Sequence, residues 1–341
     1  MSIISKIKKN KTILQGGGAQ EFLIEKFNLI KGWILMTRFG LEYYKLSKLK
    51  KDQKEKFNLL KEKFVQHYED LKKYDFSEYI TEDFERVLKK LEKPFMPVPK
   101  FSFLANSSVR YVMAFTKGGK SLREELSFLE SKYPEQELKD FLLEDYVGGP
   151  LIMNSKYLTS HNSIHHLHHL ACYQEKTNCD FKQINTVVEW GGGYGNLAKI
   201  YNRFVDKKTT YIIFDVPLFS CVQWLYLSTI FGEDSINLFK NPNDTVQAGK
   251  INLIPVVFRD SHCNIKADLF ISTWALSESG RDAQDYVVKD CNWYNSNHLL
   301  LAYSNSSKAI PDSERISEFA KKYGANIIDI DFLHGNHYLF L

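Results

Sequence analysis

The fold is decided by one stretch, Thr186-Val-Val-Glu-Trp-Gly-Gly-Gly-Tyr-Gly-Asn-Leu-Ala198. An apolar run ends in an acid, glycines follow at every second position, and the apolar residues after them have the spacing of one helix face. This order predicts a strand, a tight loop and a helix. Alternate glycines let the backbone approach a ligand, while the helix offers free N–H groups and the positive end of its dipole. The loop is therefore predicted to hold a nucleotide-like cofactor.

The spacing of the glycines distinguishes between cofactors. A dinucleotide-binding loop needs Gly-x-Gly-x-x-Gly, but counting from Gly191 or from Gly193 puts Asn196 or Ala198 at the last position. The pattern Glu-x-Gly-x-Gly-x-Gly over residues 189–195 instead resembles the first motif of the class I S-adenosylmethionine-dependent methyltransferases. In that family the loop cradles the methionine part of the cofactor. The alternative is a glycine-rich turn in another α/β protein.

Further cofactor contacts are expected where the next strands end. A buried strand predicted over residues 211–215 ends in Asp215, whose carboxylate can accept hydrogen bonds from both ribose hydroxyls. Val216 would flank the adenine, and a strand predicted over residues 268–274 ends at the same rim of the sheet. The residues predicted to bind S-adenosylmethionine are Glu189, Gly191, Gly193, Gly195, Asn196, Asp215, Val216, Thr273 and Trp274.

The fold class follows from the order of the predicted elements. Helical patterns fill residues 20–91, whereas strands alternate with helices after the glycine loop. Two closing strands at 326–330 and 337–341 are joined by a short turn, which predicts one antiparallel strand in an otherwise parallel sheet. We therefore expect an α/β fold in two domains. A mainly helical domain over 1–147, which recognises or docks the substrate, would precede a Rossmann-like methyltransferase domain over 148–341.

Several segments together support a narrower resemblance. They are Gly148-Gly-Pro150, the glycine loop, Phe214-Asp-Val-Pro217 with Gln223-Trp-Leu-Tyr-Leu227, Ser272-Thr-Trp-Ala-Leu-Ser-Glu278 and Leu301-Ala-Tyr-Ser-Asn305. This set resembles the sugar O-methyltransferases found in bacterial polysaccharide clusters, over roughly residues 145–305. The resemblance implies O-methylation of a sugar hydroxyl in a surface glycan or an activated sugar. The alternatives are a methyltransferase for nucleic acid or another small molecule, and a non-catalytic scaffold that keeps the fold.

Methyl transfer to a hydroxyl needs a group that takes the proton as the oxygen attacks. The candidate bases are Glu278 after the fourth strand, His165 and His169 on a helix predicted over residues 160–174, and His262. His165 and His169 are four residues apart and share a helix face. Two such histidines can ligate a metal, but the sequence shows no third ligand and no His-Glu-x-x-His motif, so a divalent metal is not predicted.

The segment over residues 114–121 has a loose similarity to a phosphate-binding loop. It ends in Gly-Gly-Lys-Ser and precedes a predicted helix, but Ala114 stands where the motif has its first glycine. No acidic strand end that could hold magnesium is evident in this half of the chain. A turn followed by a helix is the simpler interpretation.

The basic charge is concentrated near the N-terminus. Residues 1–73 contain 17 Lys and Arg against 8 Asp and Glu, a net charge of +9, so the remainder of this +4 chain carries −5. A basic segment can dock on anionic lipid, on phosphate-bearing glycan or on nucleic acid. The alternative is a solvated helical face. We expect a glycan or activated-sugar substrate and a peripheral membrane contact, and we do not expect a nucleic-acid partner, because no Asn/Asp-Pro-Pro-Tyr signature follows the fourth strand.

The cysteines and the N-terminal sequence indicate the cellular compartment in which the protein is expected. The five cysteines are scattered and lack Cys-x-x-Cys spacing, which predicts reduced thiols rather than disulfides or a zinc site. Lysines at 6, 8, 9 and 11 precede a glycine triplet instead of an apolar signal-peptide core, and no apolar run is long enough to span a membrane. The predicted location is the cytoplasm, with peripheral contact at the inner face of the membrane.

Overall fold

A parallel sheet built from buried apolar strands forms the centre of the molecule. The computed structural model describes residues 19–76 and 80–341. Strands such as the one at residues 211–214 are completely buried, as expected when helices cover both faces of a parallel sheet. The strands of the sheet are β3 (Thr186–Trp190), β4 (Thr210–Asp215), β5 (Ile236–Leu238), β6 (Ile251–Pro255), β7 (Leu269–Thr273), β8 (His298–Ser304), β9 (Asn326–Asp329) and β10 (Asn336–Phe340).

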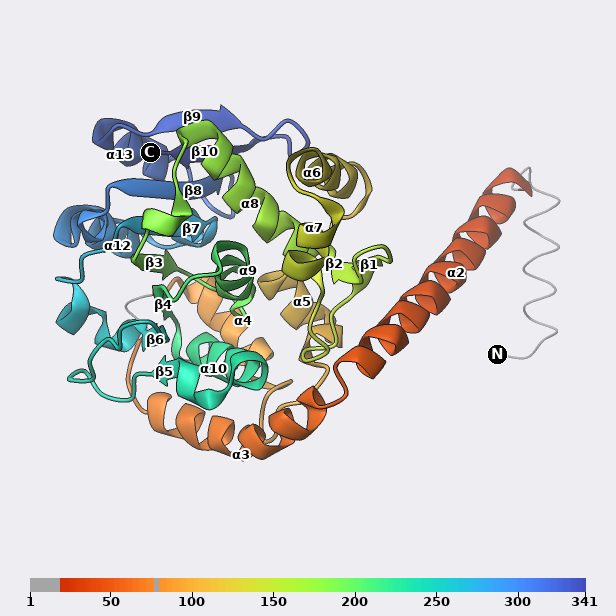
Figure 1. The fold of residues 1–341 in the computed structure, drawn as a ribbon, viewed down its shortest axis with the longest axis horizontal. Helices are drawn as coiled ribbons and strands as arrows, with labels where there is room; N and C mark the ends of the chain where they lie inside the picture. Colours follow the sequence, from red (N-terminus) through yellow and green to blue (C-terminus); the bar gives the residue numbers. More distant parts are fainter. Residues whose placement is uncertain (1–18, 77–79) are drawn as a thin grey trace.

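The strand order is β5-β6-β4-β3-β7-β8-β10-β9 (Figure 1). The pairs from β5 to β8 are parallel, whereas β10 runs antiparallel to both of its neighbours. This is the mostly parallel sheet of a methyltransferase-like Rossmann fold, and the predicted fold class is confirmed. The chain moves outward from β3 through β4 to the edge strand β5, fills the gap with β6, and then crosses to β7 on the other side of β3. Open α/β sheets bind ligands at such a switch point, beyond the carboxyl ends of the strands.

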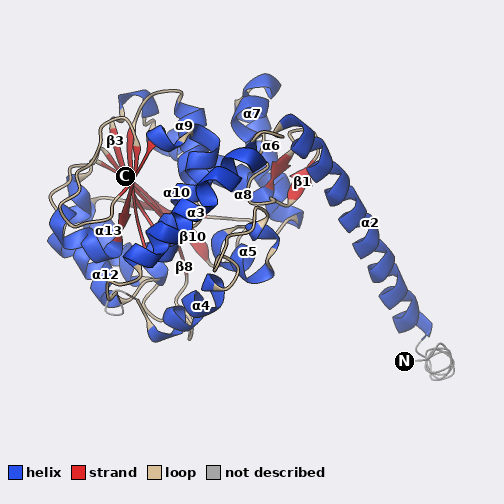
Figure 2. Ribbon diagram, turned by 90° about the horizontal axis from the view of Figure 1, so that it is seen from below, coloured by secondary structure: helices blue, strands red, loops and turns tan. Residues whose placement is uncertain are grey.

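Helices enclose the sheet (Figure 2). The N-terminal half contributes α2 (Ala19–Leu49), α3 (Gln53–Leu71), α4 (Glu82–Glu92), α5 (Ser107–Met113), α6 (Gly119–Lys132) and α7 (Glu135–Leu142), followed by the small pair β1 (Ile152–Asn154) and β2 (Thr159–Ser160). The other helices are α8 (His161–Thr177), α9 (Asn196–Val205), α10 (Pro217–Phe231), α11 (Ala275–Glu278), α12 (Arg281–Asp285) and α13 (Arg315–Tyr323).

The N-terminal helices pack directly on the sheet domain. Helix α3 lies along α10, α6 lies on α8, and α7 contacts α9. Buried residues of α3, such as Phe57 and Phe64, belong to the same hydrophobic cluster as the sheet strands. The proposed boundary between residues 147 and 148 stays a prediction, although both stretches share this one core. Among the described helices, α2 alone extends away from the rest of the protein over most of its length (Figure 1).

Local sequence explains where the predicted elements differ from the structure. The apolar run that begins at Ile251 continues to Val257, but β6 ends at Pro255 and the chain continues as a 3₁₀ helix over Val256–His262, because proline cannot donate a sheet hydrogen bond. The short edge strand β5 was not predicted, since three residues between a turn and a loop carry little periodicity. Trp274 has φ +65°, which ends β7 and turns the chain into α11.

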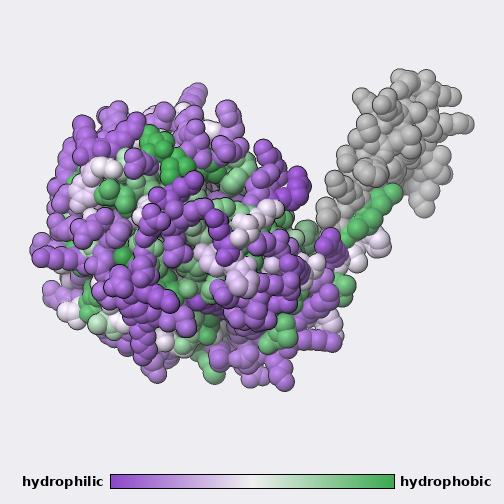
Figure 3. All heavy atoms as spheres, turned by 45° about the horizontal axis from the view of Figure 1, so that its top comes forward, coloured by the Kyte–Doolittle hydropathy of each residue, from purple (hydrophilic) through white to green (hydrophobic). Residues whose placement is uncertain are grey.

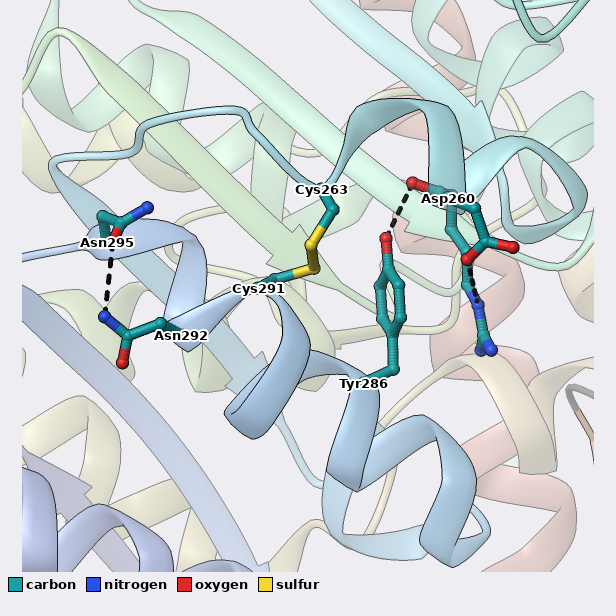
Figure 4. The surroundings of a disulfide bond; sticks show 7 residues. Asp260, Cys263, Tyr286, Cys291, Asn292 and Asn295 are labelled. Atoms are coloured by element: carbon teal, nitrogen blue, oxygen red, sulfur yellow. Dashed lines mark hydrogen bonds and ion pairs between the residues drawn. A yellow bond between two sulfur atoms is a disulfide. The ribbon is translucent and has the colours of Figure 1, made fainter.

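The prediction of five reduced cysteines is wrong for one pair. Cys263 and Cys291 form a disulfide, with their Cα atoms 5.1 Å apart (Figure 4). The two residues are 28 positions apart, and only the folding of the turn after β6 against the helical segment after α12 brings them together. A sequence without paired cysteine motifs cannot reveal such a contact. Cys172, Cys179 and Cys221 are free and buried.

Two expectations concern membranes. Among residues 19–76 and 80–341, no helix combines the length and apolarity that crossing a bilayer requires. The lysines at positions 6, 8, 9 and 11 lie outside the described residues.

Candidate functional site

The glycine loop joins β3 to α9 at the switch point of the sheet. Gly191, Gly193 and Gly195 have φ of +80°, +57° and +92°, so all three use the left-handed backbone that the sequence predicts. A Cβ atom on Gly191 would lie only 2.1 Å from the Cβ atom of Ala275, because the loop packs tightly against the start of α11. The loop therefore brings the carboxyl ends of β3 and β7 into direct contact.

This close approach predicts a strong effect of Gly191→Ala on stability. The variant would combine a left-handed alanine with a steric overlap, whereas Gly232→Ala, at φ +91°, would meet nothing within 4 Å. We expect the free energy of unfolding to fall by about 1–3 kcal/mol more for Gly191→Ala than for Gly232→Ala. Chemical denaturation of the two variants measures the difference, and equal losses would contradict the packing described above.

Two buried acids lie beside the loop. Glu189 accepts a hydrogen bond from the Tyr211 hydroxyl at 2.9 Å, and burial raises its pKa to about 8. Asp215 accepts from the main-chain N–H of Val216 at 2.9 Å and from the Gln223 amide at 2.8 Å. Burial outweighs these hydrogen bonds and raises the pKa of Asp215 to about 7. A further hydrogen-bond donor from a ligand would therefore stabilise the ionised form of each carboxyl group.

Gln223 on α10 completes the cradle around the loop. Its Nε2 donates to the carbonyl of Gly193 at 3.1 Å as well as to Asp215, which fixes the orientation of the amide. Its Oε1 is buried and has no hydrogen-bond partner among the described residues. An unpaired buried acceptor is costly, and a hydroxyl or ammonium donor of a cofactor would satisfy it. The loop, Asp215 and Gln223 thus fit a cofactor such as S-adenosylmethionine, which carries both kinds of donor.

The side chains of Asn196 and Val216 are less clearly placed to contact a cofactor. The Asn196 side chain turns toward α8, where its Nδ2 contacts His166 Nδ1 at 2.9 Å and its Oδ1 lies 3.3 Å from the hydroxyl oxygen of Ser163. The group of Asn196 that can face a cofactor is its main-chain N–H at the start of α9. Val216 is buried and precedes α10, beside Asp215.

Helix α8 packs against α9 and carries five histidines. The tautomer of His161 is set by its surroundings, because the main-chain N–H of Gly118 donates to its Nδ1 at 2.8 Å. Its proton therefore lies on Nε2, which donates to Glu125 Oε2 at 2.9 Å. Glu125 is completely buried, and its other oxygen contacts Nδ1 of His165. Each carboxyl oxygen of Glu125 therefore faces one ring nitrogen, and we assign the ring proton of His165 to Nδ1, the nitrogen that contacts Oε1.

His165 consequently has an unprotonated Nε2. This atom is buried and has no hydrogen-bond partner among the described residues. The imidazole stacks on Phe115, with ring centroids 3.8 Å apart, and faces Trp274 at 5.5 Å. Burial and the neighbouring histidines hold the pKa of His165 well below its ordinary value, so the ring is neutral at physiological pH. A carboxylate-oriented imidazole with a free lone pair is the arrangement of a general base.

His169 is one turn further along the same face. Its ring centroid lies 4.1 Å from that of His165, and its Nδ1 contacts the hydroxyl of Tyr338 at 2.7 Å. Its Nε2 is likewise buried without a described partner, and burial lowers its pKa well below the ordinary value. His168 shares the Tyr338 hydroxyl at 3.3 Å. The structure thus brings the two predicted histidines together beside Trp274.

A short extended segment, Ala114–Gly118, lies over this cluster, and we call it the strap. The main-chain N–H of Phe115 donates to Asn162 Oδ1 at 2.7 Å, and Asn162 Nδ2 donates to the hydroxyl of Tyr194 in the glycine loop at 3.0 Å. A Cβ on Gly193 would lie 3.5 Å from the carbonyl oxygen of Met113, just before the strap. The segment that resembles a phosphate loop, residues 114–121, therefore consists of the strap and the first residues of α6, and the strap covers the glycine loop.

The remaining predicted residues fall at the end of β7 and after β6. Trp274 donates from its indole N–H to Asn336 Oδ1 at 2.8 Å, and half-buried Thr273 precedes it. Glu278 ends α11 with an exposed side chain, while the protein around it desolvates the carboxyl group and raises its pKa. Both ring nitrogens of His262 contact main-chain carbonyls, those of Phe258 and Asp244, at 2.8 and 2.9 Å. His262 therefore has no nitrogen left for a substrate.

Four residues of this site were not predicted from the sequence, namely Glu125, Phe115, Asn162 and Gln223. Glu125 is in the charged run Arg-Glu-Glu over residues 123–125, which reads as a solvated helix face. The other three carry no motif, although Gln223 lies within a segment used for the family resemblance. In the part of the chain that the structure describes, no group of three or more His, Cys, Asp or Glu side chains is arranged to hold a metal ion.

Comparisons with known proteins give fold-level similarity. No protein-family model and no curated protein matches the chain. Similar solved structures include Aeropyrum pernix fibrillarin with natively bound S-adenosylmethionine, at 10% identity and TM-score 0.32 over 46% of this chain and 65% of that chain. An O-methyltransferase family protein from Burkholderia thailandensis has 12% identity and TM-score 0.34 over 69% and 76%. The SAH-bound methyltransferase PaMTH1 of Podospora anserina has 10% identity and TM-score 0.32 over 78% and 96%.

The chain spans less than two thirds of the fibrillarin chain, and identities and TM-scores are low throughout. The class of protein therefore rests on the strand order and on the glycine loop at the switch point. Together they define a Rossmann fold of the kind used by S-adenosylmethionine-dependent methyltransferases.

Proposed function

We propose that this protein is an S-adenosylmethionine-dependent O-methyltransferase whose acceptor is a sugar hydroxyl, in a surface glycan or an activated sugar. The observation that carries the proposal is the buried, unpartnered Nε2 of His165, held by Glu125 beside the glycine loop. A hydroxyl group needs such a proton acceptor when its oxygen attacks a methyl group. A fold used only as a scaffold would gain nothing from an imidazole whose free lone pair is buried and unsatisfied.

The cofactor would be held by residues around the glycine loop. The main-chain N–H groups at the start of α9 would face its carboxylate, Asp215 would accept from its ribose hydroxyls, and Gln223 Oε1 would accept from a further donor. Bound S-adenosylmethionine supplies a sulfonium methyl group that an acceptor oxygen can take by in-line displacement. The strap and Trp274 would keep water from this region, because the rings of Phe115 and Trp274 both stack on the imidazole of His165.

The proton of the acceptor hydroxyl would pass to His165 Nε2. The resulting imidazolium keeps its Nδ1 proton against Glu125, so the carboxylate stabilises the charge that develops. His169, whose ring lies 4.1 Å from that of His165, would orient the acceptor, and the exposed carboxyl group of Glu278 would bind a second hydroxyl of a sugar. Polyhydroxylated acceptors suit this combination, which supports the sugar class that the sequence resemblance implies.

A methyl-transfer assay tests the proposal. Labelled S-adenosylmethionine would be incubated with the protein and with surface-glycan precursors of the host, with and without a metal chelator. We expect label in a sugar hydroxyl, unchanged by the chelator. Label in DNA or RNA but in no glycan precursor would contradict the sugar acceptor, and failure to bind S-adenosylmethionine would contradict the enzyme class.

A further inference from the structure

Helix α2 has one face packed on the protein and an opposite face with no partner among residues 19–76 and 80–341. Near its C-terminal end, Leu46 is completely buried and the ring of Tyr43 packs 4.8 Å from that of Tyr146. The rest of the helix projects away from the sheet domain (Figures 1 and 2).

An apolar stripe follows the outer face of this projecting helix. Counted from Ile30, its described members follow at intervals of three, one, seven and three positions. These intervals place all of them within about a third of the helix circumference. Each is 54–70% exposed, and Figure 3 shows hydrophobic residues on this helix beyond the compact part of the molecule. We define the outer stripe as Ile30, Trp33, Ile34, Leu41 and Tyr44.

Charge decides which partner fits the outer stripe. Arg38 and Lys45 lie seven residues apart along one flank of the stripe, and the sequence has Lys31 a further seven positions before Arg38. Residues 1–49 contain nine Lys and Arg against three Glu, a net charge of +6. The only described acid of the helix outside its first turns, Glu42, is buried and paired with Lys45.

A second copy of the chain suits these charges poorly. In a two-stranded coiled coil, the residues that flank the apolar seam pair with opposite charges on the partner helix. Here the flank carries only positive charge in its described part, and Thr37 and Lys48 interrupt the seam. A surface of anionic lipid, by contrast, accepts an apolar stripe with basic flanks, and Trp and Tyr favour the lipid–water interface.

We infer that the outer stripe of α2 docks the protein on the surface of an anionic membrane. The helix lies in the plane of the interface, with Trp33 and Ile34 inserted among the lipids and the basic flank near their headgroups. The sheet domain stays outside the lipid, anchored through the packed end of α2. Docking would hold the site near acceptors that are attached to lipid, but it does not depend on methyl transfer.

Co-sedimentation of the full chain with lipid vesicles tests this inference. Vesicles of phosphatidylcholine alone would be compared with vesicles that also contain phosphatidylglycerol. We expect the protein to bind the anionic vesicles and to dissociate as salt is raised, because screening weakens headgroup attraction. The variant Ile34→Asp/Leu41→Asp should lose binding roughly tenfold or more, since it removes two large apolar side chains from the interface.

The control is Leu59→Asp/Tyr111→Asp, which introduces the same charge at two exposed hydrophobic positions outside α2. It should bind nearly as well as the wild type. The inference is overturned if the wild type ignores anionic vesicles, or if the control loses as much binding as the stripe variant. A third outcome would also overturn it: the wild type is a dimer in solution, the stripe variant is a monomer, and neither binds vesicles. That result would assign the outer stripe to contact with a second copy of the chain.

Discussion

Replacement of His165 by asparagine should lower kcat for methyl transfer by about 10²–10⁴-fold, the usual contribution of a general base. Asparagine fills similar space and can still contact Glu125, but it offers no basic nitrogen at the position of Nε2. Binding of S-adenosylmethionine should change little, because the cofactor contacts lie on the glycine loop and α10. Steady-state kinetics and calorimetry of the purified variant separate these two effects.

A matched control is His334→Asn, at an exposed histidine outside the site. It should retain full activity. If His165→Asn keeps kcat within a few-fold of the wild type while remaining folded, proton transfer does not use this imidazole.

The pH profile gives an independent prediction. A base acts in its unprotonated form, and burial together with neighbouring histidines holds the pKa of His165 well below 6.5. The ring becomes protonated only as pH falls through that lowered value. At saturating cofactor and acceptor, kcat should therefore stay level from pH 8 to below 6.5 before it falls. A decline of kcat centred above pH 6.5 would argue against His165 as the base.

Replacement of Lys199 by methionine should cost about 3–5 kcal/mol of unfolding free energy, the loss seen when one partner of a buried ion pair is removed. Lys199 is completely buried, and its ammonium contacts the Glu144 carboxylate, which also accepts from the hydroxyls of Ser160 and Ser163 at 2.6 Å each. This network joins α9 to the start of α8. Without Lys199, Glu144 would be a buried charge without its main counter-ion.

The pH dependence of this loss has a defined sign. Burial alone would raise the pKa of Glu144, but Lys199 and the two serines outweigh burial and lower that pKa to about 2. The ionised pair thus stabilises the wild type above about pH 4.5, and this contribution is lost as pH falls toward 2. Urea denaturation should show the gap between variant and wild type narrowing over that range.

The control for this experiment is Lys132→Met, which breaks an exposed ion pair with Glu175. Such pairs contribute about 0–1 kcal/mol. Equal losses for the two methionine variants at pH 7 would contradict the structural role given to the buried pair.

The sequence predicted the fold because each strand carries its own signal. The runs before Glu189 and Asp215 are short, apolar and end in an acid, and the alternate glycines of the loop require the positive φ that the structure shows. The closing hairpin predicted one antiparallel strand, and β10 is that strand. These features are local, so a single sequence can reveal them.

The candidate site was less predictable because its parts meet only after folding. Glu125 lies 40 residues before His165, in a helix whose sequence resembles a solvated surface, and α6 must pack on α8 before the two side chains touch. The strap belongs to a segment whose glycines and lysine resemble a phosphate loop. Its link to the glycine loop runs through the hydrogen bonds of Asn162, a residue that belongs to no motif. Long-range packing of this kind leaves no periodicity in a single sequence.

Binding of S-adenosylmethionine at the glycine loop, measured by isothermal titration calorimetry, is the decisive test of the proposed function. We predict one site per chain in the wild type and at least roughly tenfold weaker binding for Asp215→Asn, because a ribose hydroxyl loses a charged acceptor and charged hydrogen bonds contribute about 1.5–3 kcal/mol. Affinity in the wild type should also weaken below pH 7, where Asp215 takes up a proton. The proposed function would be contradicted if the folded wild type gave no heat of binding, or if Asp215→Asn bound S-adenosylmethionine with the same affinity.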